Sequence, residues 1–472
     1  MPRPPPLVPL VPAAFLFGAL VAAGSSARAA LPTRSTVTAD AVDVVTISSA
    51  SARGAAVTPR NIHVSALSTT AFEPQALHLT ATFPGDRTGI EIPHCGGRAA
   101  VSVDGTTYAP PPGPFVLRLP ERKEAHVVSI DVVVSAYERR IACGDPIRVG
   151  PVVDAHEGLM RIDFASPPAA TARGGGYAIL YVPPGHDEKK PGPLLVGVPP
   201  WNGTPWTYAA YAELLAAARK NDVPLLFPSG LGNSLYVADA ELEVWRAIDA
   251  AKAMLAVDEH RMSIWGASMG GQGAMTIALH HPDAFAVVGS FFGDARFDLS
   301  TYVRSILPTP DAAHRVNPID AIDNARHQYT FLIHGDADKT SSVTESDKLN
   351  EALVLRGYGV SYDRVPGRGH EGLLVAQQIG KIVDRASLTI SPAFPTHVTF
   401  RSVRAEDTEA YGVRIVRLAP GDAFVDLERT TDGNVTVRAE NVKEIVLANG
   451  ALGLARGAGL SPNGTAVTLR WE

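Results

Sequence analysis

The segment of the sequence most able to do chemistry is Gly-Ala-Ser-Met-Gly-Gly at residues 266–271. It directly follows an apolar run at 261–265 that predicts a strand, and it opens a stretch with helical periodicity. A serine in such a sharp strand-to-helix turn projects its hydroxyl above the carboxyl edge of a sheet. Side chains at Gly266 and Gly270 would clash with the neighbouring strand and helix, so only small residues fit there. We therefore expect Ser268 to be a nucleophile and not an ordinary turn residue.

A serine hydroxyl needs a base to accept its proton and an acid to orient that base, and here both must follow the serine along the chain. The segment His-Gly-Asp-Ala-Asp at 334–338 ends an apolar run, and either Asp336 or Asp338 could lie on that loop. His370 ends a Gly-rich loop after the last predicted strand and is the expected base. We expect His334, at the strand end, to pack and not to react.

A serine nucleophile also needs two backbone N–H groups that stabilise the oxyanion formed in the reaction. Met269 follows the nucleophile and supplies one. Trp201 is the first residue able to donate in the loop after a predicted strand at 194–198, because the two prolines before it have no N–H. Trp206 and Tyr208 follow closely and are candidates for an aromatic substrate-binding wall, although aromatic residues at a helix start belong to the core about as often.

Other classes of site are absent from the sequence. It has no His-Glu-x-x-His, no Cys-x-x-Cys and no Gly-x-Gly-x-x-Gly after a strand, so we expect neither a metal nor a cofactor. The net charge of −6 and the lack of a polybasic run argue against a nucleic-acid partner.

These residues lie in a region, 156–387, where short apolar runs alternate with amphipathic stretches, as in an α/β fold with a mostly parallel sheet flanked by helices. The expected strands are 177–182, 194–198, 224–227, 262–265, 285–290 and 329–333, and the expected helices are 208–220, 346–356, 371–385 and one with its apolar face at Val244, Ile248, Ala251 and Leu255.

Alternating apolar residues predict β-structure on both sides of this region. Residues 30–155 read as an N-terminal β-sandwich and 388–472 as a small C-terminal β-domain. The two cysteines, Cys95 and Cys143, lie in the first of these, and in an oxidising compartment a single disulfide is expected, with two free buried thiols as the alternative.

Residues 1–29 have the pattern of a signal peptide, namely Arg3, an apolar stretch at 7–24 and Ala-Arg-Ala at 27–29. Two prolines interrupt the apolar stretch, which favours export over a membrane anchor. We expect the mature chain to lie in the periplasm or outside the cell, without a membrane span.

The central region resembles the α/β-hydrolase superfamily, in particular secreted esterases of the polyhydroxybutyrate-depolymerase and feruloyl-esterase type and prolyl-oligopeptidase-like hydrolases. The resemblance is carried by Val-Asp-Glu-His-Arg at 257–261, the 266–271 turn, His-Pro-Asp-Ala-Phe-Ala at 281–286, the 334–338 segment and Gly-Arg-Gly-His at 367–370. It implies a Ser-His-Asp triad, and its spacing after the Gly prefers Asp338 as the acid over Asp336. Residues 30–155 resemble a galactose-binding-type jelly roll, which either binds carbohydrate or, as we favour, has a structural role.

The expectation is an exported serine hydrolase that cleaves carboxylic esters of a small molecule or polymer through an acyl-enzyme intermediate. The Met after Ser268 looks esterase-like, because peptidases of the prolyl oligopeptidase family commonly have Tyr or Asn there. A serine peptidase of that type is the alternative, and a catalytically silent carbohydrate- or polymer-binding protein on a hydrolase scaffold is the third hypothesis.

Overall fold

The structure of the chain is a computed structural model. From residue 159 onwards it describes all residues except 172, 174, 210, 298, 300–302 and 459–461. Before that it describes 35–37, 43–44, 47–52, 55–57, 75–92, 99–108, 115–134, 148–149 and 152–154. Cys95, Cys143 and residues 1–29 lie outside the described residues, so the disulfide and the signal peptide stay predictions.

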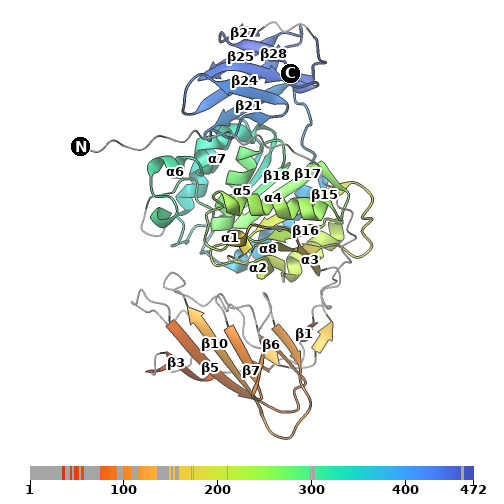
Figure 1. Ribbon diagram of the computed structural model, residues 1–472, viewed down its shortest axis with the longest axis vertical. Helices are drawn as coiled ribbons and strands as arrows, with labels where there is room; N and C mark the ends of the chain where they lie inside the picture. Colours follow the sequence, from red (N-terminus) through yellow and green to blue (C-terminus); the bar gives the residue numbers. More distant parts are fainter. Residues whose placement is uncertain are drawn as a thin grey trace, which may run out of the picture.

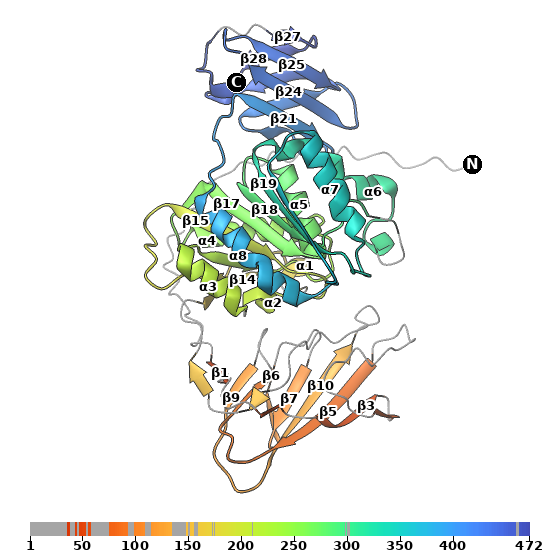
Figure 2. The same cartoon turned by 180° about the vertical axis from the view of Figure 1, so that it is seen from behind.

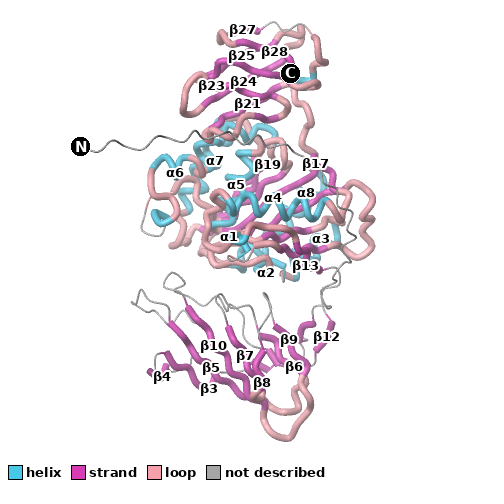
Figure 3. Tube along the Cα trace, viewed as in Figure 1, coloured by secondary structure: helices cyan, strands magenta, loops and turns pink. Residues whose placement is uncertain are grey.

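Three regions follow one another along the chain: a β-rich region, a central region of helices around a sheet, and a second β-rich region (Figures 1 and 3). The alternating apolar patterns correctly predict β-structure at both ends of the chain. None of the helices in the described part of the chain is long and apolar enough to cross a membrane.

The central sheet has eight strands in the order β13-β14-β16-β15-β17-β18-β19-β20. The strand β14 is antiparallel to both of its neighbours, and the strands from β16 to β20 run parallel. This is the mostly parallel sheet that the sequence predicts. The strands are β13 (Leu159–Asp163), β14 (Tyr177–Tyr181), β15 (Gly192–Val198), β16 (Leu225–Pro228), β17 (Val257–Ala267), β18 (Val287–Phe291), β19 (Tyr329–Gly335) and β20 (Val360–Val365).

Helices cover both faces of this sheet and form two cores (Figures 1 and 2). One face packs against α4 (Asp239–Lys252), α5 (Met269–His280) and α7 (Val343–Leu355). The other packs against α2 (Trp206–Ala209), α3 (Ala212–Asn221) and α8 (Gly372–Leu388). Short helical segments also occur: α1 (Pro168–Thr171), α6 (Pro310–His314), and 3-10 segments at 303–305, 318–327 and 451–453.

Some boundaries differ from the sequence-based expectation. The single helix expected at 208–220 is two helices, because the chain leaves helical geometry at Tyr211, where φ is −71° and ψ is 110°. The strands β13 and β20 were not among the expected strands, and β17 begins five residues earlier than its apolar core. The apolar face expected from 244 to 255 is fully buried, as predicted.

The C-terminal β-region consists of two four-stranded sheets, β21-β24-β25-β27 and β22-β23-β26-β28. Their strands are β21 (His397–Ser402), β22 (Glu409–Ala410), β23 (Val413–Arg417), β24 (Ala423–Arg429), β25 (Val435–Glu440), β26 (Val442–Leu447), β27 (Pro462–Gly464) and β28 (Thr468–Trp471). One apolar core lies between the two sheets.

Polar contacts join this region to the far end of α5 and the start of α4. Arg404 Nη1 donates to Glu241 Oε2 at 2.6 Å, and the Tyr411 hydroxyl donates to the Pro282 carbonyl at 2.6 Å. His280 Nδ1 is hydrogen-bonded to the Asp407 carboxylate, and both side chains are buried. A joint made of buried, paired polar groups holds the two regions in one orientation.

The N-terminal β-region contains a six-stranded sheet, β4-β3-β5-β10-β7-β8, a four-stranded sheet, β2-β11-β6-β9, and the pair β1-β12. The strands are β1 (Ser35–Val37), β2 (Asp43–Val44), β3 (Ile47–Ala52), β4 (Ala55–Val57), β5 (Gln75–Phe83), β6 (Gly89–Ile92), β7 (Ala99–Val103), β8 (Thr106–Tyr108), β9 (Phe115–Arg118), β10 (His126–Val134), β11 (Arg148–Val149) and β12 (Val152–Asp154).

Candidate active site

Ser268 lies in the turn between β17 and α5 in a backbone conformation that L-residues rarely adopt, with φ of 57° and ψ of −123°. The turn is held from both sides, because Ser268 N donates to the Phe291 carbonyl at 2.8 Å and Gln272 N donates to the Ser268 carbonyl at 3.0 Å. Strained residues of this kind persist where the surrounding structure fixes them, and they concentrate at functional sites.

Two glycines make this turn possible, as the sequence predicts. A Cβ atom at Gly266 would lie 2.3 Å from the Gly270 carbonyl oxygen and 2.7 Å from that of Val198. A Cβ atom at Gly270 would lie 2.2 Å from the Val198 oxygen. The start of α5 therefore packs directly against the ends of β17 and β15, which leaves Ser268 at the carboxyl edge of the sheet.

Asp338 follows β19, and its carboxylate is fully buried. Its Oδ1 accepts hydrogen bonds from Thr340 N at 2.7 Å and Ser341 N at 3.0 Å, while its Oδ2 lies 2.7 Å from His370 Nδ1. The carboxylate of Asp336 turns to the next loop and accepts from Gly367 N at 2.7 Å. Of the two acids left open by the residues alone, the structure brings Asp338 to His370.

His370 lies in the loop between β20 and α8. Since a carboxylate only accepts hydrogen bonds, the contact with Asp338 places a proton on Nδ1, and neutral His370 then has Nε2 as its acceptor. The loop is tied to the end of β19, because Ala337 N donates to the Arg368 carbonyl at 2.9 Å. A Cβ atom at Gly335 would lie 2.2 Å from that same carbonyl oxygen, so the two segments are in close contact.

The serine turn and the histidine loop meet over the end of β18. Phe291 accepts the backbone hydrogen bond of Ser268, and the next residue, Phe292, donates through its N–H to Ile333 at 2.9 Å. The Phe292 ring packs on the imidazole of His370, with 4.3 Å between the ring centroids. The sequence analysis does not single out Phe292, although its place two residues after an expected strand could have signalled it.

The loop that contains Trp201 follows β15 and is fixed beside the start of α5. Tyr236 donates its hydroxyl to the Pro199 carbonyl at 2.6 Å. Asn202 and Asn233 form two reciprocal hydrogen bonds of 2.6 Å, one through the Asn202 N–H. No local pattern predicts this asparagine pair, because it joins segments that are 31 residues apart.

Tyr208 needs a correction. Its side chain is only 2% exposed, its ring lies 4.4 Å from that of Trp265, and its hydroxyl accepts the N–H of Ala267 at 3.0 Å. Burial raises the pKa of Tyr208 well above its ordinary value, so the hydroxyl stays protonated. Tyr208 therefore belongs to the core beneath the serine turn and does not line a substrate wall. Trp206 is half-buried and packs against the same core.

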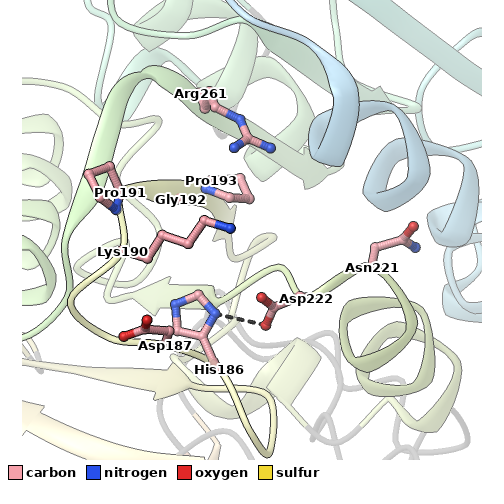
Figure 4. Close-up of a pocket in the computed structure, with 9 residues that line it drawn as sticks. All are labelled: His186, Asp187, Lys190, Pro191, Gly192, Pro193, Asn221, Asp222 and Arg261. Atoms are coloured by element: carbon pink, nitrogen blue, oxygen red, sulfur yellow. Dashed lines mark hydrogen bonds and ion pairs between the residues drawn. The ribbon is translucent and has the colours of Figure 1, made fainter.

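A pocket of about 180 Å³ lies at the opposite edge of the sheet (Figure 4). Its lining includes Lys190, His186 and Arg261. Arg261 directly precedes the buried part of β17, and His186 Nδ1 lies 2.8 Å from Asp222 Oδ1. Ser268 follows the other end of β17, so this pocket is not part of the candidate active site.

The central region has the mostly parallel sheet and the strained serine turn of an α/β-hydrolase fold, and part of its sequence is similar to a family of serine hydrolases. The model of the prolyl oligopeptidase family matches residues 242–386, which run from α4 to α8 and include Ser268, Asp338 and His370. None of the curated protein sequences compared with the chain matches it.

Several solved structures are similar to the chain at low sequence identity. The fluorophosphonate-binding serine hydrolase F of Staphylococcus aureus is 15% identical, with a TM-score of 0.42 over 48% of this chain and 98% of its own. An S-formylglutathione hydrolase from Agrobacterium tumefaciens is 18% identical, with a TM-score of 0.42 over 50% and 97%. Dipeptidyl peptidase 4 of Porphyromonas gingivalis is 16% identical, with a TM-score of 0.37 over 44% and 33%.

Proposed function

We propose that the protein is an exported hydrolase of carboxylic esters that works through the triad Ser268, His370 and Asp338. The observation that carries this proposal is the 2.7 Å contact between His370 Nδ1 and the buried carboxylate of Asp338. It directs the unprotonated Nε2 of neutral His370 away from the acid, as a base for a serine hydroxyl requires. Export is proposed from the signal-peptide pattern of residues 1–29.

In this mechanism Ser268 Oγ attacks the ester carbonyl carbon while its proton moves to His370 Nε2. Asp338 stays ionised and stabilises the imidazolium. His370 then gives the proton to the departing alkoxide, which leaves as the alcohol, and the acyl group stays on Ser268. A water molecule, deprotonated by the same imidazole, then attacks the acyl carbon. His370 returns this proton to Ser268 Oγ as the acyl–oxygen bond breaks, which releases the carboxylic acid and restores the serine hydroxyl.

The negative charge on the carbonyl oxygen needs donors that are already in place. We assign these to the backbone N–H groups of Met269, at the start of α5, and of Trp201. The hydrogen bonds that fix the Trp201 loop, from Tyr236 to Pro199 and between Asn202 and Asn233, support this assignment because they hold the loop rigidly.

A serine peptidase is the second candidate, and the match of residues 242–386 to the prolyl oligopeptidase family is the observation that favours it. Esters and amides are both cleaved through an acyl-enzyme, so a Ser-His-Asp triad is compatible with either substrate. The Met after the serine favours the ester.

The test compares a chromogenic ester and a chromogenic anilide that share one acyl group, for the wild type and Ser268→Ala. Ester turnover that is lost in the variant supports the proposal, and faster anilide turnover moves the assignment to a peptidase. Labelling with a fluorophosphonate probe is the independent readout. Wild-type protein that reacts with neither the substrates nor the probe would contradict both enzymatic assignments.

A further inference from the structure

The buried carboxylate of Asp338 faces a second histidine. Besides His370, the imidazole of His334 approaches the same Oδ2 atom, with 3.4 Å between His334 Nε2 and Asp338 Oδ2. His334 is the next-to-last residue of β19 and is fully buried. The carboxylate therefore lies between two imidazoles, that of His370 in the loop before α8 and that of His334 on β19.

The hydrogen-bond partners of His334 fix its tautomer. Its Nε2 lies 3.1 Å from the Ser341 carbonyl oxygen, which can only accept, so Nε2 bears the hydrogen. Its Nδ1 lies 2.8 Å from Ser346 Oγ and accepts the hydroxyl hydrogen of that serine. Burial is the main cause that lowers the pKa of His334, which keeps this imidazole neutral.

We propose that His334 is a positioning residue for the triad acid: its Nε2–H is shared between the Ser341 carbonyl and Asp338 Oδ2 and holds that carboxylate in line with His370. This inference rests on the function proposed above. The same contact withdraws negative charge from Oδ2, which is also the oxygen that accepts from His370 Nδ1. The Phe292 ring lies beside both imidazoles, with centroid distances of 4.3 Å to His370 and 6.2 Å to His334.

Two more acids face this cluster from neighbouring elements. Asp294, in the segment after β18, accepts a hydrogen bond from the Ser341 hydroxyl, and Glu345 in the first turn of α7 lies close to it. Burial is the main cause that raises the pKa of Asp294. Both acids are left unchanged in the experiment, so that the field they exert on His370 is the same in every variant.

The experiment measures kcat/KM for the chromogenic ester from pH 4.5 to 9 in His334→Phe, His334→Gln and Ser346→Ala. Phe keeps a ring but loses the donor, so the acidic limb, which reports His370, should move about 0.5 pH unit upward and kcat should fall about tenfold. Gln keeps an N–H near the position of Nε2 and should restore most of both. Ser346→Ala removes the hydroxyl that donates to His334 Nδ1 and so no longer fixes the His334 tautomer. It should move the acidic limb in the same direction by a smaller amount.

Thr330→Val is the matched control, because Thr330 is also fully buried on β19 and its hydroxyl has no hydrogen-bond partner among the described residues. It should leave the limb in place. Thermal melts and fluorophosphonate titration give the folded, reactive fraction of each variant. If His334→Phe does not fold, Ser346→Ala decides.

An acidic limb that stays in place in the folded variants, even with a lower kcat, would overturn the role of His334 and leave it as a packing residue. Ester turnover that persists at the wild-type rate in the Ser268→Ala variant would instead overturn the proposed function itself. The two failures therefore give different results in the same set of measurements.

Discussion

The carboxylate of Asp338 lies 2.7 Å from Nδ1 of His370, whereas that of Asp336, only two residues earlier, is bound to the backbone of Gly367. One short loop thus presents two acids to two different partners. The two carboxylates can be separated by experiment because each can be replaced by its amide without a change of shape.

Asp338→Asn should lower kcat for ester hydrolysis by about 10⁴-fold, because an amide holds the wrong tautomer of the histidine and does not stabilise an imidazolium. Asp336→Asn keeps an oxygen that can accept from Gly367 N and should lose less than about threefold. Steady-state kinetics of both variants check this. A larger loss in Asp336→Asn than in Asp338→Asn would reassign the acid.

The serine turn should reject any side chain at its first glycine. Gly266→Ala places a methyl group against two backbone carbonyls, so we expect a loss of about 1–3 kcal/mol in the free energy of unfolding and a loss of activity. Gly380→Ala is the control: a Cβ atom there meets open space within α8, and better helix propensity should add about 0.5–1 kcal/mol. Urea unfolding curves measure both, and equal stabilities of the two variants would contradict the packing described here.

Tyr208→Phe removes the acceptor of the buried Ala267 N–H, which is one residue before Ser268. We expect a loss of about 1–3 kcal/mol in the free energy of unfolding and a lower kcat with little change in KM. Thermal melts and initial-rate kinetics check both. A variant with wild-type stability and a raised KM would contradict the core role and indicate that Tyr208 contacts the substrate, as its sequence position suggested.

The joint with the C-terminal β-region should weaken in acid. Burial alone would raise the pKa of Glu241, but the hydrogen bond from His281 and the charge of Arg404 lower it to about 2, against 4.5 in the unfolded chain. A carboxyl whose folded pKa is depressed stabilises the fold above its unfolded pKa, and this stability is lost as the pH falls from 4.5 to 2. It amounts to about 3 kcal/mol at neutral pH.

Urea unfolding at several pH values, in wild type and Glu241→Gln, measures this contribution. The wild type should be the more stable at pH 6, and the difference should shrink steadily below pH 4.5 because the wild-type residue becomes neutral like the amide. A difference that is constant from pH 6 to pH 2.5 would show that the ionisation of Glu241 does not stabilise the joint.

The sequence predicts the parts of the site that follow from local pattern. A strand, a turn of small residues and a helix identify Ser268 because the turn itself imposes those residues, and chain order then leads to His370. Contacts between segments that are distant in the chain have no such local sequence pattern. The pair Asn202 and Asn233 and the packing of Phe292 on His370 depend on how separate loops meet, which no spacing along the chain records.

The same limit explains Tyr208. Its neighbourhood in the chain, next to the Trp201 loop, favoured a wall around the substrate, but burial is decided by the packing of α2 against Trp265 of β17. Likewise, the sequence does not predict β20, because most of its residues are only half-buried, as is usual at the edge of a sheet, and its apolar pattern is weak.

Helix α5 has both of its ends fastened: the first is Met269, beside the strained serine, and the last is His280, paired with Asp407 of the C-terminal β-region. The twelve residues of this helix span about 18 Å, and we treat the helix as a rigid element over that length. The height of the nucleophile above the sheet is thus set jointly by two parts of the chain. Removing the chain after Leu388 would remove Asp407 and leave α5 held only at its first residue, Met269.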